Sequence, residues 1–326
     1  MKKNYLDIID PIHDFIRVYD YELPIIDSPL FQRLRRIKQL SGAHLTYPSA
    51  QHSRFEHSLG VMHIATEAGF ALNEKGFLNS DDVQILRLAG LLHDIGHGPF
   101  SHLFEEVIQE KKISHEDYGK KIILNSEIGD ILSKTGFNKK LVTQIAFGES
   151  KFQYLNEIVS GALSADMMDY LLRDGYFTGA EHAKVDHKRI TQSLSIHKKK
   201  IALERSALYS FESMMHSRYQ MFKAVYFHKT VRAAEVMLIQ ALRLSDEEFG
   251  FTSFNLNEYV KLTDEFVLSS IISSKSSKLK QAKQLAEDYQ NRKLLKCVFE
   301  RILTSQTNLK KTRTDELRLE LSRKSK

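Results

Sequence analysis

The chain has 326 residues, of which 42% are hydrophobic, and its 47 basic and 41 acidic residues give a formal charge of +6 at pH 7. This hydrophobic content is enough for a large folded core and excludes a wholly disordered chain. The single cysteine, Cys297, excludes an intrachain disulfide and suits a reducing compartment. No apolar run is long enough to cross a membrane, and the charged first residues lack the apolar run of a secretory signal. We therefore expect a cytoplasmic protein with no membrane partner, whose basic charge favours nucleotides or nucleic acid.

Apolar residues at helical spacing dominate the first hundred positions, after a short β-hairpin or extended arm predicted over residues 8–19. A serine followed by a proline predicts the start of a helix over 28–40, whose opposite face is basic. A second helix is expected over 54–73, with His57 on its apolar side. A third, over 80–94, is apolar nearly all round, which is typical of a helix buried on most sides.

The rest of the chain is also predicted to be helical, apart from a small hairpin over 191–204 with its turn at the lysines of 198–200. Further helices are expected over residues 101–110, 115–133, 138–147, 153–174, 207–244 and 256–302. The polar, basic end of the chain, 305–326, is predicted to be a surface helix or a loose tail. We therefore predict a mostly α-helical bundle over residues 1–250, a C-terminal helical lobe over 251–302 and a basic tail over 303–326.

A histidine and an aspartate, His93 and Asp94, end the buried helix. An ionised carboxylate there is costly unless a cation meets it, and imidazole with carboxylate suits a divalent ion such as Mn, Fe, Mg, Ni or Zn. His57 is a third candidate ligand, and Asp166, predicted to share a helical face with Ala162, is a fourth. Each residue alone could be a core histidine with its hydrogen bonds made within the protein, or an aspartate that caps a helix. Together they predict a metal centre with positions left open for water and substrate.

Three more histidines, His97, His102 and His115, follow this pair within a short stretch. A histidine beside a metal can protonate a leaving oxygen or stabilise a phosphoryl group. We predict these catalytic roles for His102 and His115. Glu105 lies one helical turn after His102 and is expected to orient its ring. His97 is expected to be structural.

Two stretches carry a recognisable pattern, RFEHSLGV at 54–61 and LAGLLHDIGHGPFSH at 88–102. They resemble the HD superfamily of phosphohydrolases and, more narrowly, the family of deoxynucleoside triphosphate triphosphohydrolases and dGTPases. The resemblance also includes 10–13, 31–40 and 169–174, and it covers most of the chain. It implies the HD-domain helical bundle for the main part of the fold.

The resemblance implies a hydrolase that splits a dNTP into the deoxynucleoside and inorganic triphosphate. It implies one divalent metal held by His57, His93, Asp94 and Asp166, and it allows a second Mg²⁺ bound with the nucleotide. The catalytic residues would be His102, Glu105 and His115. The substrate-binding residues would be Arg54 and Arg218 at the phosphates, Gln39, Tyr170 and Asp174 at the sugar, and Tyr226 toward the base.

The same resemblance matches Asp27, Gln32 and Arg35 to residues that read a guanine base at an allosteric site. An aspartate suits the N1 and N2 donors of guanine, and an arginine suits its O6 and N7 acceptors. A GTP or dNTP activator and a homo-oligomer, a dimer or tetramer, would follow. The alternative is an ordinary helix start with a solvated basic face.

Three departures from the family pattern bear on the substrate. Glu105 replaces an aspartate, Met167 replaces a lysine that would contact the triphosphate, and Phe227 replaces a glutamine near the base. Two alternatives therefore stay open. The protein could be an HD phosphohydrolase or phosphodiesterase that acts on another nucleotide. It could also be a non-enzymatic protein that binds nucleic acid through its basic charge.

Overall fold

Two long helices of the computed structural model, α3 (Arg54–Glu74) and α4 (Ser80–Leu92), pack along each other within the main hydrophobic core. α3 begins with a capping box, in which the side chains of Ser53 and Glu56 accept hydrogen bonds from each other's backbone N–H groups. α4 begins with a second capping box. These caps fix where both helices start, so His57 lies in the first turns of α3 and the His93 side chain follows directly after α4.

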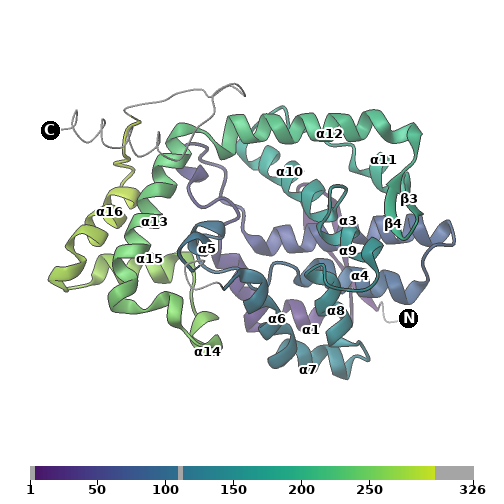
Figure 1. Ribbon diagram of the computed structural model, residues 1–326, viewed down its shortest axis with the longest axis horizontal. Coiled ribbons are helices and arrows are strands. Elements are labelled where there is room, and N and C mark those ends of the chain that lie inside the picture. The colour runs from purple at the N-terminus through teal and green to yellow at the C-terminus, as the bar shows by residue number, and fades with distance from the viewer. Residues whose placement is uncertain (1–3, 109–112, 298–326) are drawn as a thin grey trace. The chain divides into compact units, whose positions relative to one another are not determined.

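The structure describes residues 4–108 and 113–297 (Figure 1). The chain divides into a compact unit, Met1–Leu295, and a second unit, Lys296–Lys326. The other elements of the first unit, in chain order, are β1 (Tyr5–Asp10), β2 (Asp14–Tyr19), α1 (Leu23–Ile26), α2 (Pro29–Gln32), α5 (His102–Ile108), α6 (His115–Asn125), α7 (Glu127–Lys134), α8 (Lys139–Ala146), α9 (Gln153–Ser160), α10 (Ala165–Thr178), α11 (His187–Gln192), β3 (Leu194–His197), β4 (Lys200–Leu203), α12 (Leu208–Met221), α13 (Lys229–Phe249), α14 (Leu256–Tyr259), α15 (Asp264–Ser273) and α16 (Lys280–Gln290).

Two small antiparallel hairpins accompany the helices. β1 pairs with β2 so that Ile8 faces Ile16, and β3 pairs with β4 across a turn at Lys198 and Lys199. Both lysines of this turn have a left-handed backbone conformation, which short hairpin turns require. The prediction of a mostly α-helical fold with a small hairpin is confirmed. No helix in the described part of the chain is long and apolar enough to cross a bilayer.

α10 approaches α3 closely at Gly60, where an added Cβ atom would lie 1.8 Å from Oδ1 of Asp169. Only glycine permits this approach of two helices. The contact places the first turn of α10, with Asp166, beside the first turns of α3, with His57. A single small residue thus decides that ligands from distant parts of the sequence meet.

A second hydrophobic cluster is built mainly from α5, α13, α15 and α16. The segment between α4 and α5 connects the two clusters, since Ile95 belongs to the first and Phe100 to the second. The predicted boundaries at residues 250 and 302 stay predictions, and the tail over 303–326 lies outside the described residues.

Some predicted helices are divided because a polar side chain caps a new start within the periodic pattern. The helix predicted over 153–174 is two helices, α9 and α10, since the Ser164 hydroxyl accepts the Met167 N–H. Ala162 therefore precedes α10, and the prediction that it shares a helical face with Asp166 is wrong. Ser126 similarly divides the helix predicted over 115–133 into α6 and α7.

The long C-terminal helices are divided as well. The helix predicted over 207–244 is interrupted by a π-helical turn, Phe222–Tyr226, and a break at Phe227. The region predicted as helical over 256–302 contains three helices, α14 to α16, within its described part. A π-helical turn of this kind often marks a functional site.

The helix predicted over 28–40 is also shorter, because α2 continues only as a 3₁₀ turn, Arg33–Arg36. Ile37 is extended and its carbonyl accepts the Arg54 N–H, which ties this segment to the start of α3. Arg33, one of the basic residues opposite the apolar side of this predicted helix, is fully buried and donates to the carbonyls of Ile95 and His97. Tertiary hydrogen bonds thus override the helical pattern at this point.

Candidate active site

The four predicted metal ligands converge from α3, the end of α4 and α10; we call them the His/Asp group. His57 Nε2 lies 3.1 Å from Asp166 Oδ1 and 3.7 Å from Asp94 Oδ2. His93 Nε2 lies 3.2 Å from Asp94 Oδ1 and 3.8 Å from Asp166 Oδ1. His57, His93 and Asp94 are buried, and the Asp166 side chain is 34% exposed, so the group opens to solvent on the side of Asp166.

The residues of the His/Asp group fit a divalent metal ion. His57 Nδ1 lies 2.8 Å from Asp169 Oδ2, and His93 Nδ1 lies 2.7 Å from the Gly90 carbonyl, so both rings present Nε2 to the carboxylates. Nε2 of His93 is buried and has no hydrogen-bond partner among the described residues. A buried nitrogen in that position is the donor that a cation requires. His57, His93 and Asp166 together could hold such an ion, whose identity the geometry leaves open.

The electrostatics of the group also favour a cation. Burial opposes protonation of His57, but hydrogen bonds to Asp166 and Asp169 outweigh it and raise the pKa of His57 to about 10. Burial likewise opposes ionisation of Asp94, yet the Arg54 guanidinium holds the pKa of that carboxyl well below its usual value. Several carboxylates therefore surround His57, and they stabilise positive charge at its Nε2 whether a proton or a metal carries it.

Asp169 is the residue of this centre that the sequence reasoning missed. It is fully buried and contacts His13 Nε2 at 2.7 Å, His57 Nδ1 at 2.8 Å and Arg173 at 2.9 Å. Arg173 also donates to Asp10 at 2.9 Å, which connects the first hairpin to the site. The available signal was an aspartate and an arginine four residues apart on one helix, a common surface pattern.

His102, His115 and Glu105, for which we predict a part in proton transfer, lie together with His97 in a second group, which we call the histidine cluster. Glu105 bridges two of the rings, with Oε2 3.2 Å from His102 Nδ1 and Oε1 2.9 Å from His115 Nδ1. Burial opposes ionisation of Glu105, but these contacts lower its pKa well below the ordinary value. The prediction that Glu105 lies in reach of His102 agrees with this geometry; its second contact, to His115, was not foreseen.

His97 links the two groups, since its Nε2 lies 3.3 Å from Asp94 Oδ1. Burial, with the nearby Arg54 charge, lowers the pKa of His97 well below its usual value, so the ring is neutral. Its ring stacks on that of His115 at 3.9 Å and 14°. Because an imidazole binds a metal in its own plane, two stacked rings cannot both point at one ion. The histidine cluster is therefore better suited to protons and phosphate oxygens than to a metal.

The segment that carries these histidines is held in an unusual backbone conformation. Phe100 and Ser101 are both left-handed, at φ values of 57° and 55°, which is strained for a bulky residue. Asp264 accepts the Phe100 N–H at 2.6 Å, and Ser41 donates to the Phe100 carbonyl at 2.6 Å. These contacts from distant segments fix the backbone before His102 and so the direction in which its side chain projects.

A cleft of about 390 Å³ adjoins both groups, a size that suits a small-molecule ligand. Its lining includes all but one of the predicted substrate-binding residues, together with His102: Gln39, Arg54, Tyr170, Asp174 and Tyr226. Arg54 connects the cleft to the His/Asp group, because its Nη1 donates to Asp94 and its Nε to Ser101 at 2.7 Å. The His102 side chain is 70% exposed, which leaves its ring accessible in the cleft.

Arg218 is the predicted residue that lies beside the cleft rather than in its lining. Burial raises the pKa of Tyr170, and the neighbouring Arg218 charge acts in the opposite direction. Asp174 accepts hydrogen bonds from Tyr226 at 2.7 Å and contacts His52 Nε2 at 2.8 Å, so both of its oxygens are engaged within the protein. Among the described residues, Oε1 of Gln39 is buried without a hydrogen-bond partner.

The departures from the family pattern differ in where they lie. Met167 is buried in the main hydrophobic core, whereas Phe227 lines the cleft with 64% of its surface exposed. The predicted allosteric residues lie elsewhere: Gln32 donates to the Ile26 carbonyl and accepts from Arg35, each at 2.8 Å. Asp27 ends α1. A guanine site at these three residues stays a prediction.

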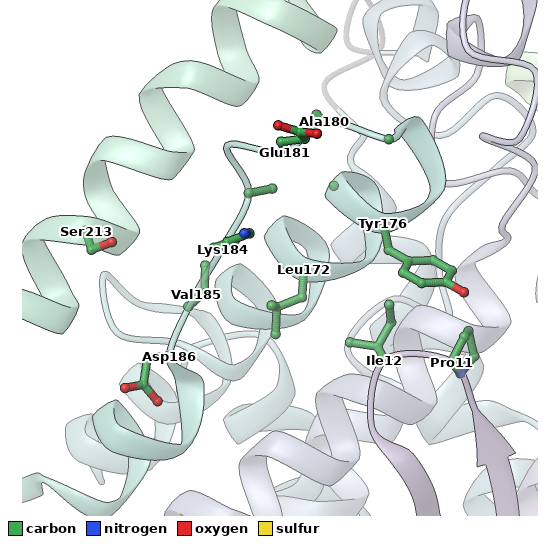
Figure 2. Close-up of a pocket in the computed structure, with 13 residues that line it drawn as sticks. Pro11, Ile12, Leu172, Tyr176, Ala180, Glu181, Lys184, Val185, Asp186 and Ser213 are labelled. Carbon is green, nitrogen blue, oxygen red and sulfur yellow. The ribbon is translucent and has the colours of Figure 1, made fainter.

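A larger hollow of about 760 Å³ lies between the first hairpin, the end of α10, the segment after it and α12 (Figure 2). Ile12, Leu172 and Val185 give it a mainly apolar lining, and Figure 2 shows Tyr176 at one side of it. Its lining includes no member of the His/Asp group or the histidine cluster. Chemistry rather than size therefore identifies the smaller cleft as the candidate active site.

Comparison with known proteins agrees with this geometry. Residues 54–174 match the family model of the HD domain, and residues 185–324 match the HD associated region. The uncharacterized protein YwfO of Bacillus subtilis is 36% identical over 79% of this chain and 64% of its own length. The uncharacterized protein MJ1154 of Methanocaldococcus jannaschii is 42% identical over 72% of this chain and 49% of its own.

The human deoxynucleoside triphosphate triphosphohydrolase SAMHD1 is 30% identical over 97% of this chain and 58% of its own length. The chain thus spans about half to two thirds of these curated relatives. A crystal structure of a hypothetical protein from Aquifex aeolicus superposes with a TM-score of 0.81 at 35% identity, covering 97% of this chain and 82% of the other. With its histidines and aspartates gathered at the matched domain, the chain belongs to the HD-domain family and carries the HD-associated region after its HD domain.

Proposed function

We propose that this protein is a metal-dependent nucleotide phosphohydrolase that splits a dNTP into the deoxynucleoside and inorganic triphosphate. The observation that carries the proposal is the position of Arg54, which contacts Asp94 of the His/Asp group and lines the cleft together with His102. One cleft thus adjoins metal ligands, a guanidinium and an accessible imidazole. The relatives named as deoxynucleoside triphosphate triphosphohydrolases support the choice of substrate.

The residues of the cleft suggest how the reaction would proceed. A divalent ion held by His57, His93, Asp94 and Asp166 would polarise a phosphoryl oxygen and neutralise its charge. The Arg54 guanidinium would stabilise the developing charge on the α-phosphate as water attacks it. Glu105, ionised by its two histidine contacts, accepts from Nδ1 of His102 and leaves Nε2 to face the cleft. With a second proton on Nε2, His102 would donate that proton to the 5′-oxygen as the bond between this oxygen and phosphorus breaks, and its ring would return to the neutral form.

The cleft also contains groups that suit the rest of a nucleotide. The buried, unpartnered Oε1 of Gln39 can accept from a sugar hydroxyl. Tyr170 offers an aromatic face to the sugar. A sugar with one additional hydroxyl group would clash with this face and be excluded by shape. Phe222 and Phe227, which both line the cleft, add aromatic surface for a base. Met167 is buried and uncharged, so it cannot make the triphosphate contact of the lysine in the family pattern. A nucleotide other than a dNTP is therefore the second candidate substrate.

The test is product analysis with the metal-loaded full chain and each dNTP, with and without GTP, with Mn, Mg, Fe and Ni supplied in turn. Deoxynucleoside together with intact triphosphate, separated by ion exchange, is the expected result. A requirement for GTP would support the site at Asp27. Release of a nucleoside monophosphate with pyrophosphate would reject cleavage between the α-phosphorus and the 5′-oxygen. No turnover of any dNTP would reject this substrate class and favour another nucleotide.

His102 provides the sharper test of the mechanism. His102→Ala is expected to reduce turnover on the order of 100-fold or more while metal content is unchanged, since proton transfer contributes about that much. His182→Ala, which changes an exposed histidine outside the cleft, is the matched control. Turnover of His102→Ala equal to that of the control would refute the assigned proton transfer.

A further inference from the structure

A short segment of the HD-associated region, residues 259–264, contacts the loop that joins the two groups of the candidate active site. This loop, residues 95–101, lies between α4 and α5 and leads directly to His102. The loop belongs to the HD domain, whereas the segment belongs to the HD-associated region. The Tyr259 hydroxyl donates to the Gly96 carbonyl at 2.7 Å, so the segment packs directly against the loop.

Arg33 connects the same two parts of the chain a second time. Its Nη1 donates to the Leu262 carbonyl at 3.2 Å. Its Nη2 donates to the carbonyls of Ile95 at 3.1 Å and His97 at 2.8 Å. Because the guanidinium is fully buried, these hydrogen bonds replace the water that its charge has lost. The loop and the segment 259–264 therefore share one buried cation.

Asp264 makes the contact that reaches the candidate active site itself. One of its carboxylate oxygens accepts the Phe100 N–H at 2.6 Å, and the other accepts the Lys38 N–H at 2.9 Å. Lys38 precedes Gln39 of the cleft lining, and Phe100 lies two residues before His102. One buried side chain thus fixes the backbone next to two residues of the cleft.

The backbone at Phe100 and Ser101 requires such support, because left-handed residues other than glycine persist only where surrounding contacts hold them. The Ser101 hydroxyl donates to the Lys38 carbonyl at 2.8 Å and accepts from Nε of Arg54 at 2.7 Å. The same backbone therefore also positions the Arg54 guanidinium. Loss of the Asp264 carboxylate would let this backbone relax and would displace the groups attached to it.

The charge of Asp264 matters for these contacts. The charged or titratable groups that act on it or that it acts on are Lys38, Arg54, Arg33 and Tyr289. Burial raises the pKa of Asp264 to about 6, while the two backbone N–H groups and the charges of Lys38 and Arg54 act in the opposite direction. Asp264 is therefore ionised above this pKa and accepts at both oxygens. Below it, one oxygen carries a proton and becomes a donor, as the nitrogen of an asparagine would be.

We propose that Asp264 is a positioning residue, whose carboxylate holds the backbone beside Gln39 and the backbone before His102 in the geometry that the reaction needs. The cleft lining given above does not include Asp264, so this residue acts through the two segments and not on the substrate. The proposal rests on the proposed function, because it concerns the rate of that reaction. It gives the HD-associated region a part in catalysis by the HD domain.

The experiment compares Asp264→Asn with Glu265→Gln in the metal-loaded full chain. Glu265 is the next residue of α15, is exposed and belongs to the same first helical turn. Both variants therefore remove one negative charge near the helix N-terminus. The kcat of Asp264→Asn for dNTP hydrolysis is expected to be roughly 10–100-fold below that of Glu265→Gln, because a small displacement of a positioned group costs about that much. Metal content should be equal in the two variants.

The pH profile separates positioning by the ionised carboxylate from a loss of structure. The ratio of the wild-type kcat to the Asp264→Asn kcat should decrease as the pH falls through about 6, because protonation removes the same acceptor from the wild type. Groups that titrate in both proteins cancel in this ratio. The same ratio at every pH would overturn the proposal, as would equal kcat values for Asp264→Asn and Glu265→Gln.

Hydrogen exchange separates failure of this proposal from failure of the proposed function. At least one of the amides of Lys38 and Phe100 should exchange on the order of tenfold faster in Asp264→Asn than in Glu265→Gln, because it loses its acceptor. No turnover by the wild type would reject the proposed function, whereas equal exchange of both amides in the two variants would overturn the positioning role.

Tyr259→Phe is the second variant, in case circular dichroism shows that Asp264→Asn is unfolded. It keeps the buried ring and removes only the hydroxyl that donates to the Gly96 carbonyl. Its kcat is expected to fall roughly twofold to tenfold, the effect of one hydrogen bond, with metal content unchanged. A kcat equal to that of Glu265→Gln would contradict support of the loop by the HD-associated region.

Discussion

Asp169→Asn tests whether the buried carboxylate behind His57 holds the site together. Asp169 is fully buried and makes four contacts of 2.7–3.0 Å, with His13, with His57 and with two nitrogens of Arg173. An asparagine keeps the shape but turns an NH₂ group toward donors that need an acceptor. Removing one partner of a buried ion pair costs about 3–5 kcal/mol.

The lower end of this range is expected, since Arg173 keeps its contact with Asp10. We therefore expect Asp169→Asn to lose about 3 kcal/mol of unfolding free energy in urea, with an unchanged denaturant slope. Metal affinity of the His/Asp group should fall about 10–100-fold because His57 loses the carboxylate that orients it.

Asp130→Asn, an exposed aspartate of α7, is the matched control and should change the free energy by no more than about 0.5 kcal/mol. The assay uses the metal-stripped full chain, so that lost metal binding does not enter the stability difference. A loss below about 1 kcal/mol for Asp169→Asn would refute the buried-network account, because so small an effect is ordinary for a single hydrogen bond.

Three further outcomes are expected. Gly60→Ala should destabilise the fold by about 1–3 kcal/mol or more in thermal unfolding, because its Cβ would overlap Asp169, whereas Gly69→Ala on the same helix, with its nearest contact at 3.3 Å, should change stability by less than about 1 kcal/mol. Chelation should lower the unfolding temperature of the metal-loaded wild type, and Asp166→Ala should show a smaller decrease; an equal decrease would contradict metal binding by the His/Asp group. Burial lowers the pKa of His44 from 6.5 to about 4, so the unfolded chain binds the proton first. Stability should therefore be lost as the pH falls from 6.5 toward 4, and His44→Gln should lose less of it; equal pH profiles in urea titrations would contradict this assignment.

The sequence alone was sufficient to propose the candidate metal ligands that lie at recognisable points of a pattern. His93 and Asp94 are polar residues at the end of a helix that is apolar and buried on most sides, and His57 lies on the apolar face of its helix. Each of them therefore differs from its apolar neighbours. Glu105 was found for a similar reason, since one helical turn separates it from His102. Local spacing determines such relationships, and local spacing is what a sequence contains.

The helix boundaries were harder to predict from the sequence, because the apolar periodicity continues through positions where a side chain ends one helix and caps the next. Ser164 and Ser126 divide two predicted helices in this way, with hydroxyls that accept backbone N–H groups. Arg33 belongs to the predicted basic face but lies buried, since the carbonyls that accept its hydrogen bonds come from Ile95, His97 and Leu262. A charge can be buried where distant backbone atoms satisfy it, and its neighbours in sequence carry no sign of them.

The sequence by itself thus determined the helical class, the histidine–aspartate pattern and part of the cleft lining, with most of the predicted substrate-binding residues. Only the tertiary structure decided that Asp169 contacts both His57 and His13, that Glu105 reaches His115, and that His187 faces Glu67. These contacts join residues from separate helices and from the first hairpin, and they form where α10 packs against Gly60. Their geometry depends on how helices approach one another, which is a property of packing and not of spacing along the chain.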